Sequence, residues 1–528
     1  MKKLVVRLSF SFFAFGFSSV VFGQVDKDVL NWYNGGGSGM QTEKAYKSLK
    51  KKKSTTVIVA VIDSGIDIEH EDLKGKIWTN TKEIAGNGID DDKNGYIDDI
   101  HGWNFLGSAG GANQNHARLE KTRIYAKLKG KYENMDASKV SAEDKAEYDL
   151  FQKVKKEITE DKDKYSEYLP QLEQLPMILQ MVPGMVSNAL GKTEYTKKDL
   201  EAWKPDNEQM VQIKAVALAM VSGELTEEVI KEQLDQIKGM IDYNLNADYD
   251  DRQFIGDNPY DFNDVKYGNN DVEGPDALHG THVGGIIGAV RGNNLGGDGV
   301  ANDVLLMSVR AVPDGDEADK DIALAIRYAV DNGAQVINMS FGKGYSPNQK
   351  EVYEAFKYAD SKGVLLVHAA GNDNADVDVN DNYPTSMYSF QKEKLDLFLT
   401  IGASTRFPKE KLPADFSNYG QTKVDVFAPG HDIYNSVPQS AYKKLNGTSM
   451  AAPMVAGVAA LLKSYFPSLT MNEIKSVILT TAKSYKGTQQ MKPGTEDKVD
   501  FATLSVTGSV VDVNAAVKKC IALEKSKK

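Results

Sequence analysis

Short apolar runs without polar alternation recur along most of the chain, and amphipathic stretches separate them. Runs of this kind are typical of strands that are buried on both faces of a parallel sheet. They occupy residues 55–62, 304–309, 336–339 and 364–370, and residues 321–332 and 351–361 between them have helical periodicity. This alternation predicts an α/β fold, a doubly wound parallel sheet with right-handed crossovers.

The pattern changes between about Gly107 and Asn246, where Lys, Glu, Gln and Met dominate. Apolar stripes at helical spacing, with Ser141 and Thr226 as candidate caps, predict several amphipathic helices here. We therefore expect an inserted all-helical subdomain. The predicted segments are a signal peptide at 1–23, a linker and helix at 24–53, α/β parts at 54–106 and 250–520, the insertion at 107–249, and a tail at 521–528.

The N-terminus has the pattern of a secretory signal peptide. Lys2, Lys3 and Arg7 precede the apolar run Leu8 to Phe22, which ends near Gly23. That run is shorter than a typical membrane span, so a retained anchor is the minor alternative and the mature chain should have no stable span. We expect an exported protein, either periplasmic or secreted.

Composition and charge further limit the partners, cross-links and cofactors that the protein can have. The 528 residues carry a net charge of −11, which argues against nucleic acid as a partner. A single cysteine, Cys520, excludes an intrachain disulfide, so stability must come from core packing or bound ions. No motif for an organic cofactor is present, and we expect none.

Four polar residues stand where predicted elements begin or end. Asp63 ends a buried strand, His279 begins a helix, Asn372 ends a strand and Ser449 begins a helix. Each has an ordinary interpretation, as a turn acid, a helix-terminal histidine, a left-handed asparagine or an N-cap. Together they supply the hydroxyl, base, carboxylate and oxyanion donor that nucleophilic serine chemistry needs.

The motifs around these residues resemble those of the subtilisin-like serine proteases (subtilases, peptidase family S8). The matching stretches are Val61–Gly65, His279–Gly285, Ala369–Asn372 and Gly447–Pro453. The resemblance covers roughly 54–106 and 255–520 and implies the triad order Asp, His, Ser. It implies that Ser449 attacks the scissile carbonyl, that His279 takes its proton and that Asp63 orients His279.

The resemblance also implies the remaining parts of the site. The Asn372 amide and the Ser449 N–H would receive the oxyanion, and Tyr383–Pro384 would form a cis-proline turn. An edge strand would pair with an extended substrate, and a second segment would line the first specificity pocket. These two segments are Ser340, Phe341 and Gly342, and Ala369, Ala370 and Gly371.

Residues 86–99 form a dense acidic loop. Asp90, Asp92 and Asn94 recur every second residue, and Asp98 falls at the ninth position of a calcium-loop pattern. His101 at the twelfth position excludes an EF-hand, which needs a bidentate Glu there. The pattern predicts a structural calcium ion on Asp90, Asp92, Asn94 and Asp98, with a solvated acidic turn as the alternative.

The sequence thus predicts an exported serine endopeptidase that cleaves extended or unfolded protein segments, with proteins or peptides as its partners. One departure from the family stands out, because 216 positions (279 − 63) separate Asp63 from His279. We hypothesise that the insertion between them covers the cleft or restricts substrates. The alternatives are a catalytically silent binding scaffold with the subtilase fold and a calcium-stabilised adhesion protein.

Overall fold

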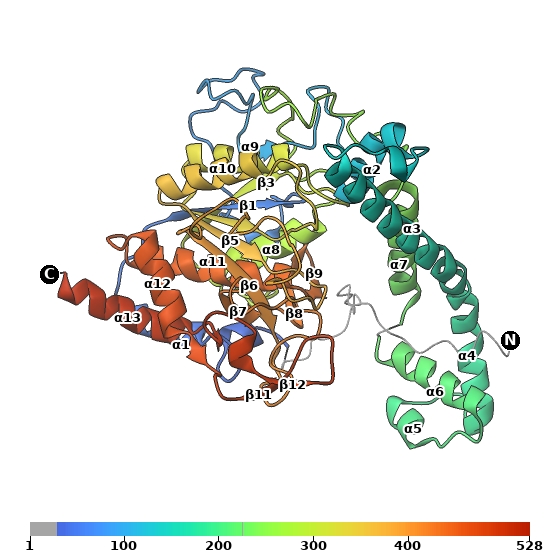
Figure 1. Cartoon of the computed structure of the whole chain (residues 1–528). Coiled ribbons are helices and arrows are strands. Elements are labelled where there is room, and N and C mark those ends of the chain that lie inside the picture. The colour runs from blue at the N-terminus through green and yellow to red at the C-terminus, as the bar shows by residue number, and fades with distance from the viewer. Residues whose placement is uncertain (1–28, 224, 528) are drawn as a thin grey trace. The chain divides into compact units, whose positions relative to one another are not determined.

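A computed structural model describes residues 29–223 and 225–527, so the predicted signal peptide lies outside the described residues. The described chain divides into two compact units, each with its own core (Figure 1). The helical unit comprises Lys121–Tyr249, and the α/β unit comprises the described residues on both sides of it. Among the described residues, no helix combines the length and apolar character needed to cross a membrane.

The α/β unit is built on a nine-stranded sheet with the order β10-β13-β7-β6-β5-β4-β1-β3-β2. Neighbouring strands pair in parallel, except that β10 and β13 are antiparallel. The strands are β1 (Val57–Asp63), β2 (Gly102–Asn104), β3 (Val304–Arg310), β4 (Val336–Met339), β5 (Leu365–Ala369), β6 (Phe398–Ser404), β7 (Val426–Pro429), β10 (Lys483–Ser484) and β13 (Ser509–Val510). Two small antiparallel pairs are formed by β8 (Ile433–Val437) with β9 (Ala441–Leu445) and by β11 (Gln489–Met491) with β12 (Lys498–Asp500).

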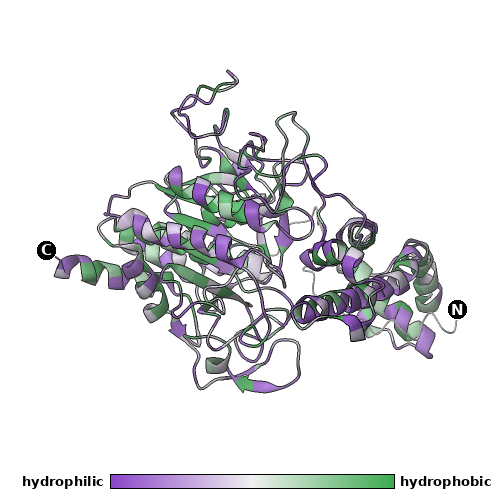
Figure 2. Ribbon diagram, turned by 45° about the horizontal axis from the view of Figure 1, so that its top comes forward, coloured by the Kyte–Doolittle hydropathy of each residue, from purple (hydrophilic) through white to green (hydrophobic). Residues whose placement is uncertain are grey.

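Helices cover both faces of this sheet, and the residues of β1 alternate between them. Val59 and Val61 belong to the core beneath α8 (Leu278–Gly288) and α11 (Thr448–Tyr465). Ala60 and Ile62 belong to the opposite core, beneath α9 (Asp319–Asp331) and α10 (Gln349–Ser361). Hydrophobic residues accordingly concentrate on the strands between the two helical layers (Figure 2). The predicted doubly wound α/β fold is confirmed.

Three further helices pack on the α8 and α11 side: α1 (Thr42–Leu49), α12 (Met471–Thr481) and α13 (Val513–Ser526). Residues 29–53, the described part of the predicted linker and helix at 24–53, also contribute side chains to this core. Tyr33, Met40 and Leu49 are fully buried in this core, and the Tyr33 hydroxyl donates to the Asp298 carbonyl (2.9 Å). Likewise, α13 continues through the predicted tail to Ser526.

The helical unit consists of α2 (Glu120–Tyr132), α3 (Lys145–Glu173), α4 (Leu175–Leu190), α5 (Lys197–Ala202), α6 (Glu208–Val221) and α7 (Glu227–Gly239). Thr226 caps α7 as predicted, accepting from the Val229 N–H. The unit starts at Lys121 and not at residue 107. Residues 107–120 belong to the α/β unit, where the bridge from His116 to Asp314 and the hydrogen bond from the Gln114 N–H to the Leu106 carbonyl (2.7 Å) hold their backbone.

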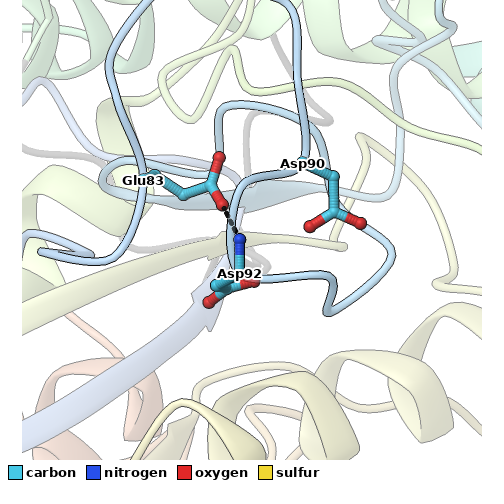
Figure 3. A group of neighbouring side chains, drawn as sticks. All are labelled: Glu83, Asp90 and Asp92. Carbon is cyan, nitrogen blue, oxygen red and sulfur yellow. Dashed lines mark hydrogen bonds between the residues drawn. The ribbon is translucent and has the colours of Figure 1, made fainter.

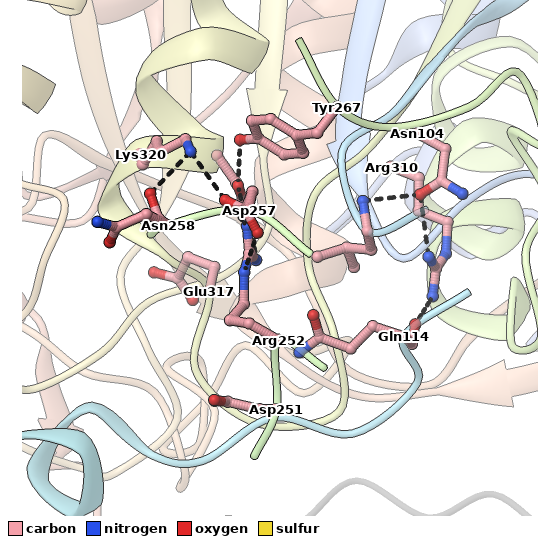
Figure 4. Close-up of polar contacts among 12 residues, drawn as sticks. Asn104, Gln114, Asp251, Arg252, Asp257, Asn258, Tyr267, Arg310, Glu317 and Lys320 are labelled. Carbon is pink, nitrogen blue, oxygen red and sulfur yellow. Dashed lines mark hydrogen bonds and ion pairs between the residues drawn. The ribbon is translucent and has the colours of Figure 1, made fainter. Parts of the chain in front are cut away.

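Ion pairs with buried carboxylates lie in the α/β unit where the chain leaves for the helical unit and where it returns. Arg118 contacts Asp251 (2.8 Å), which joins the outgoing and returning segments. Arg252 continues this network to Asp257 and to Asp321 on α9, as Figure 4 shows in part. These pairs place the flanks of the insertion side by side, which explains how the sheet tolerates so long an insertion.

Candidate active site

Asp63 and His279 meet at the carboxyl edge of the sheet. Asp63 is the last residue of β1 and is 1% exposed, and His279 is the second residue of α8. Their side chains contact through Asp63 Oδ1 and His279 Nδ1 (2.7 Å). Because an ionised carboxylate only accepts, this contact places the proton on Nδ1 and leaves Nε2 as the acceptor.

The environment of His279 favours its protonated form. Burial lowers the pKa of the ring, but the charge of Asp63 and the hydrogen bond to it outweigh burial, so the pKa lies above the ordinary value. Asp63 itself is held by the Ser64 N–H, which donates to the same oxygen (2.8 Å). A base oriented in this way can accept a proton at Nε2.

Ser449 is the second residue of α11. Gly447, the residue just before the helix, has a φ of 157°. The first N–H groups of a helix have no acceptor within it, so this end is suited to an anion. The Ser449 hydroxyl donates to the Ser340 carbonyl (3.3 Å), and the Ser340 hydroxyl donates to the Ser449 carbonyl (2.9 Å). Among the described residues, the Ser449 hydroxyl thus bonds to the Ser340 carbonyl and not to His279.

Thr448 fixes the orientation of Asn372. The Asn372 Oδ1 accepts from the Thr448 N–H (2.8 Å) and from its hydroxyl (3.0 Å). The Gly371 N–H in turn donates to that hydroxyl (3.0 Å). Because Oδ1 is held against the helix, the Nδ2 group faces the other way and can serve as a donor beside Ser449. Asn372 is exposed, as a substrate-contacting group must be.

The two predicted substrate-binding segments follow β4 and β5. Ala369, Ala370 and Gly371 lie at the end of β5 and just after it, as expected. Ser340, Phe341 and Gly342 do not form the predicted edge strand, because β4 ends at Met339 and is an interior strand between β5 and β1. They leave the sheet instead, since Ser340 bonds to Ser449 and the Phe341 carbonyl accepts from His368 Nε2 (2.8 Å).

Sequence reasoning missed two residues that hold this site together. Thr448 belongs to the serine motif, and the motif alone does not reveal that this residue positions Asn372. Asn418 donates to the Ala370 carbonyl (2.9 Å) and accepts from Asp373 N–H (2.9 Å) and Ala375 N–H (2.8 Å). Its contacts depend on pairing distant in sequence, so local pattern could not identify it. The predicted cis bond at Tyr383–Pro384 is present.

The acidic loop presents a different set of carboxylates from the one predicted. Glu83, Asp90 and Asp92 have oxygens within 4.8 Å of one another (Figure 3). Asp98 instead accepts from the N–H groups of Gly86 and Gly88, each at 2.8 Å. Its carboxylate is thus engaged in holding the loop.

Two further features bear on cation binding at this loop. Asn94 uses its Oδ1 to accept from Tyr96 N–H (2.8 Å) and its Nδ2 to donate to Asp99 (3.0 Å). Glu83 is 8% exposed, and its buried Oε2 has no hydrogen-bond partner among the described residues. Buried carboxylate oxygens without a partner are costly, and a hard cation such as calcium satisfies them. Glu83, Asp90 and Asp92 therefore form a candidate donor set for a hard cation, and this set shares Asp90 and Asp92 with the predicted one.

The fold and this arrangement of Asp, His, Asn and Ser define a protein of the subtilisin-like class. Sequence comparison agrees, since residues 54–503 match the profile of the subtilase family. The chain belongs to the subtilase family of serine proteases.

Individual relatives have protease names. Over 230 residues, the chain is 39% identical to a thermophilic serine proteinase of Bacillus sp. (strain AK1), covering 43% of this chain and 52% of that protein. It is 34% identical to subtilisin DY of Bacillus licheniformis (46% and 82% covered). It is 38% identical to thermitase of Thermoactinomyces vulgaris (40% and 69% covered). The chain thus spans about half the length of the first of these relatives.

Proposed function

We propose that this protein is an exported serine endopeptidase that hydrolyses peptide bonds in extended or unfolded protein segments. One observation carries the proposal. The 2.7 Å contact between Asp63 and His279 joins residues 216 positions apart, at the same sheet edge where Ser449 begins a helix beside Asn372. The family of the chain supports the same reaction class.

The reaction proposed for these residues has two halves. Ser449 Oγ attacks the scissile carbonyl while His279 Nε2 takes its proton, and the oxyanion is received by Asn372 Nδ2 and the Ser449 N–H. His279 then gives that proton to the leaving amine, and the C–N bond breaks to leave an acyl-enzyme. Water, activated by the same histidine, hydrolyses the ester and restores Ser449. Asp63 stays ionised throughout and balances the imidazolium.

A labelling experiment combined with digestion tests the proposal. Wild type should react with a fluorophosphonate at Ser449 and should digest casein, and Ser449→Ala should do neither. Ser464→Ala is a matched control because this serine lies near the other end of the same helix, α11, and it should behave as wild type. If wild type neither labels nor digests casein, the chain is a binding scaffold with the subtilase fold.

We also propose that the acidic loop binds a structural calcium ion through Glu83, Asp90 and Asp92. The unpartnered Oε2 of Glu83 supports this set. Bound there, calcium would neutralise three carboxylates and hold the loop that follows β1; it takes no part in the hydrolysis. The loop is also anchored without an ion, because Tyr328 on α9 donates to Asp99 (2.7 Å).

Export is proposed from the charge and hydropathy of residues 1–23 alone. Expression of the full chain in a bacterial host, followed by N-terminal sequencing of the exported protein, tests this. A start near Gln24 in the periplasm or medium is the expected result. Recovery of the uncleaved chain in the membrane fraction would identify the segment as an anchor.

A further inference from the structure

His368 is a buried histidine that the proposed reaction does not use. It lies in the interior strand β5, is 1% exposed, and pairs with Met339 of β4 and Thr400 of β6. Burial lowers the pKa of the ring to about 4, so the ring is neutral near neutral pH. A neutral ring inside the sheet serves as a fixed hydrogen-bonding group and not as an acid or base.

The ring bonds to a carbonyl that lies outside the sheet. His368 Nε2 contacts the Phe341 carbonyl oxygen at 2.8 Å. Because a carbonyl only accepts, Nε2 carries the proton and Nδ1 keeps its lone pair. Nδ1 is buried and has no hydrogen-bond partner among the described residues, which costs stability. An apolar residue would therefore suit this position better if packing were the only requirement.

The Phe341 carbonyl needs a side-chain donor because the ladder of β4 has ended. β4 pairs with β5 up to Met339, and the chain then leaves the sheet. Phe341 is buried, and a buried carbonyl outside a ladder needs another donor. His368 supplies that donor from the neighbouring strand.

This bond also orients the next N–H group. In a trans peptide the C=O and the following N–H point in opposite directions, so holding the Phe341 carbonyl toward β5 turns the Gly342 N–H away from it. Gly342 is exposed, and its N–H is therefore open to a substrate carbonyl. On the other side of Phe341, the Ser340 carbonyl accepts from the Ser449 hydroxyl (3.3 Å). His368 and Ser449 thus hold consecutive carbonyls of one segment.

We propose that His368 is a positioning residue for the hydrolysis, whose Nε2–H holds the Phe341 carbonyl and thereby presents the Gly342 N–H to the main chain of an extended substrate. The inference rests on the proposed proteolysis by Ser449 and on the predicted pairing of substrate with this segment. His368 itself touches neither the substrate nor the reacting atoms. Its loss should therefore affect substrates that have a main chain to pair and spare those that have none.

The test compares two substrates of the full-length enzyme. A peptide with several acyl-side residues can pair with the segment, whereas p-nitrophenyl acetate has no main chain to pair. kcat/KM is normalised to the sites titrated by fluorophosphonate, and the rates of Ser449→Ala are subtracted. In His368→Met, which fills the space but has no donor, kcat/KM for the peptide should fall about two- to tenfold relative to that for the acetate, the scale of one hydrogen bond.

Further variants separate the hydrogen bond from packing. His368→Gln places an amide donor near the position of Nε2 and should keep the wild-type ratio of the two kcat/KM values. Phe398→Leu trims the ring that packs beside His368, with centroids 5.8 Å apart, so stability should fall while the ratio is unchanged. If His368→Met has no titratable sites, His368→Asn replaces it, because its shorter amide does not reach Phe341.

The failures are distinguishable. An equal fall for both substrates in His368→Met, or the same change of the ratio in His368→Gln or Phe398→Leu, overturns this inference and leaves the protease intact. Absence of titratable sites in both His368→Met and His368→Asn also overturns it, because His368 then serves folding. Equal cleavage by wild type and Ser449→Ala, or none by either, overturns the proposed function and this inference with it.

Discussion

His279 connects the electrostatics of the site to the pH dependence of activity. The base must be neutral to accept the Ser449 proton, and the net effect of Asp63 raises the pKa of His279 above 6.5 despite burial. Activity should therefore fall as pH drops through a midpoint above 6.5, measured as kcat/KM against pH. In Asp63→Asn the midpoint should move to lower pH, and kcat should fall about 10⁴-fold. A flat profile from pH 5 to 8 would show that another group is the base.

Asn372 and Thr448 should differ in how much they contribute to kcat. Asn372→Ala removes the proposed oxyanion donor, so kcat should fall about a hundred- to a thousandfold with little change in KM. Thr448→Val removes only the hydroxyl that orients Asn372, so its loss should be smaller. Asn380→Ala, an exposed amide in the same loop, is the control for both. A loss confined to KM in Asn372→Ala would mean that the amide binds ground-state substrate only.

At the scale of elements, the segment after β4 is anchored by a buried charge. The Lys343 ammonium contacts Glu120 and Asp319, each at 2.9 Å, and all three side chains are nearly fully buried. Lys343→Met leaves two buried carboxylates without their cation and should lower the free energy of unfolding by about 3–5 kcal/mol. Denaturant titration measures this, and the exposed pair of Lys145 with Asp149 gives the control.

The control substitution, Lys145→Met, should change the free energy of unfolding very little. Lys145 and Asp149 are 60% and 58% exposed, so Lys145→Met should change stability by less than about 1 kcal/mol. Replacing both Lys343 and Glu120 with apolar residues should recover part of the loss, because one of the two buried carboxylates that contact this cation is removed as well. Equal effects of Lys343→Met and Lys145→Met would show that the buried pair contributes no more than a surface pair.

The acidic loop gives a prediction about ion removal. Chelation, with calcium removal verified by elemental analysis, should lower the melting temperature because an ion bound only by the native state stabilises it. Glu83→Gln should abolish that shift, whereas Asn94→Ala should preserve most of it, since Asn94 is occupied by Tyr96 and Asp99. The opposite order would restore the ligand set predicted from spacing.

Elements were predictable where one local pattern decides them. The strand ending at Asp63 and the helix opening at Thr448 follow from uninterrupted apolar runs, and each bears a candidate catalytic residue. Contacts distant in sequence were not predictable. The spacing of Asp98 suggests a ligand, but its carboxylate is used by Gly86 and Gly88. Asn418 stands in a polar loop with no periodic signal, and only its hydrogen bonds with Ala370, Asp373 and Ala375 place it at the site.

At the scale of the whole molecule, the chain is two units that have separate cores and are joined twice. The helical unit has its own core, including Leu172, Val182 and Ile230. The α/β unit retains both flanks of the insertion through the contact of Arg118 with Asp251 and that of Glu120 with Lys343. The folding of the α/β unit should therefore not depend on the helices.

Replacing residues 122–248 with a short Gly/Ser linker tests this independence. Because Arg118 and Asp251 are already in contact at 2.8 Å, the linker closes a short loop at small entropic cost. The shortened protein should label with fluorophosphonate at the wild-type rate and unfold cooperatively. Arg118→Ala in the same background should unfold at a lower denaturant concentration, since the ion pair then no longer holds the flanks together.

Turnover of casein compared with that of a short peptide separates folding from substrate access. If the helices restrict substrates, casein turnover should rise in the shortened protein while peptide turnover is unchanged. Equal turnover of both substrates before and after the replacement would remove that role for the insertion, and failure to fold would show that the α/β unit requires the helices.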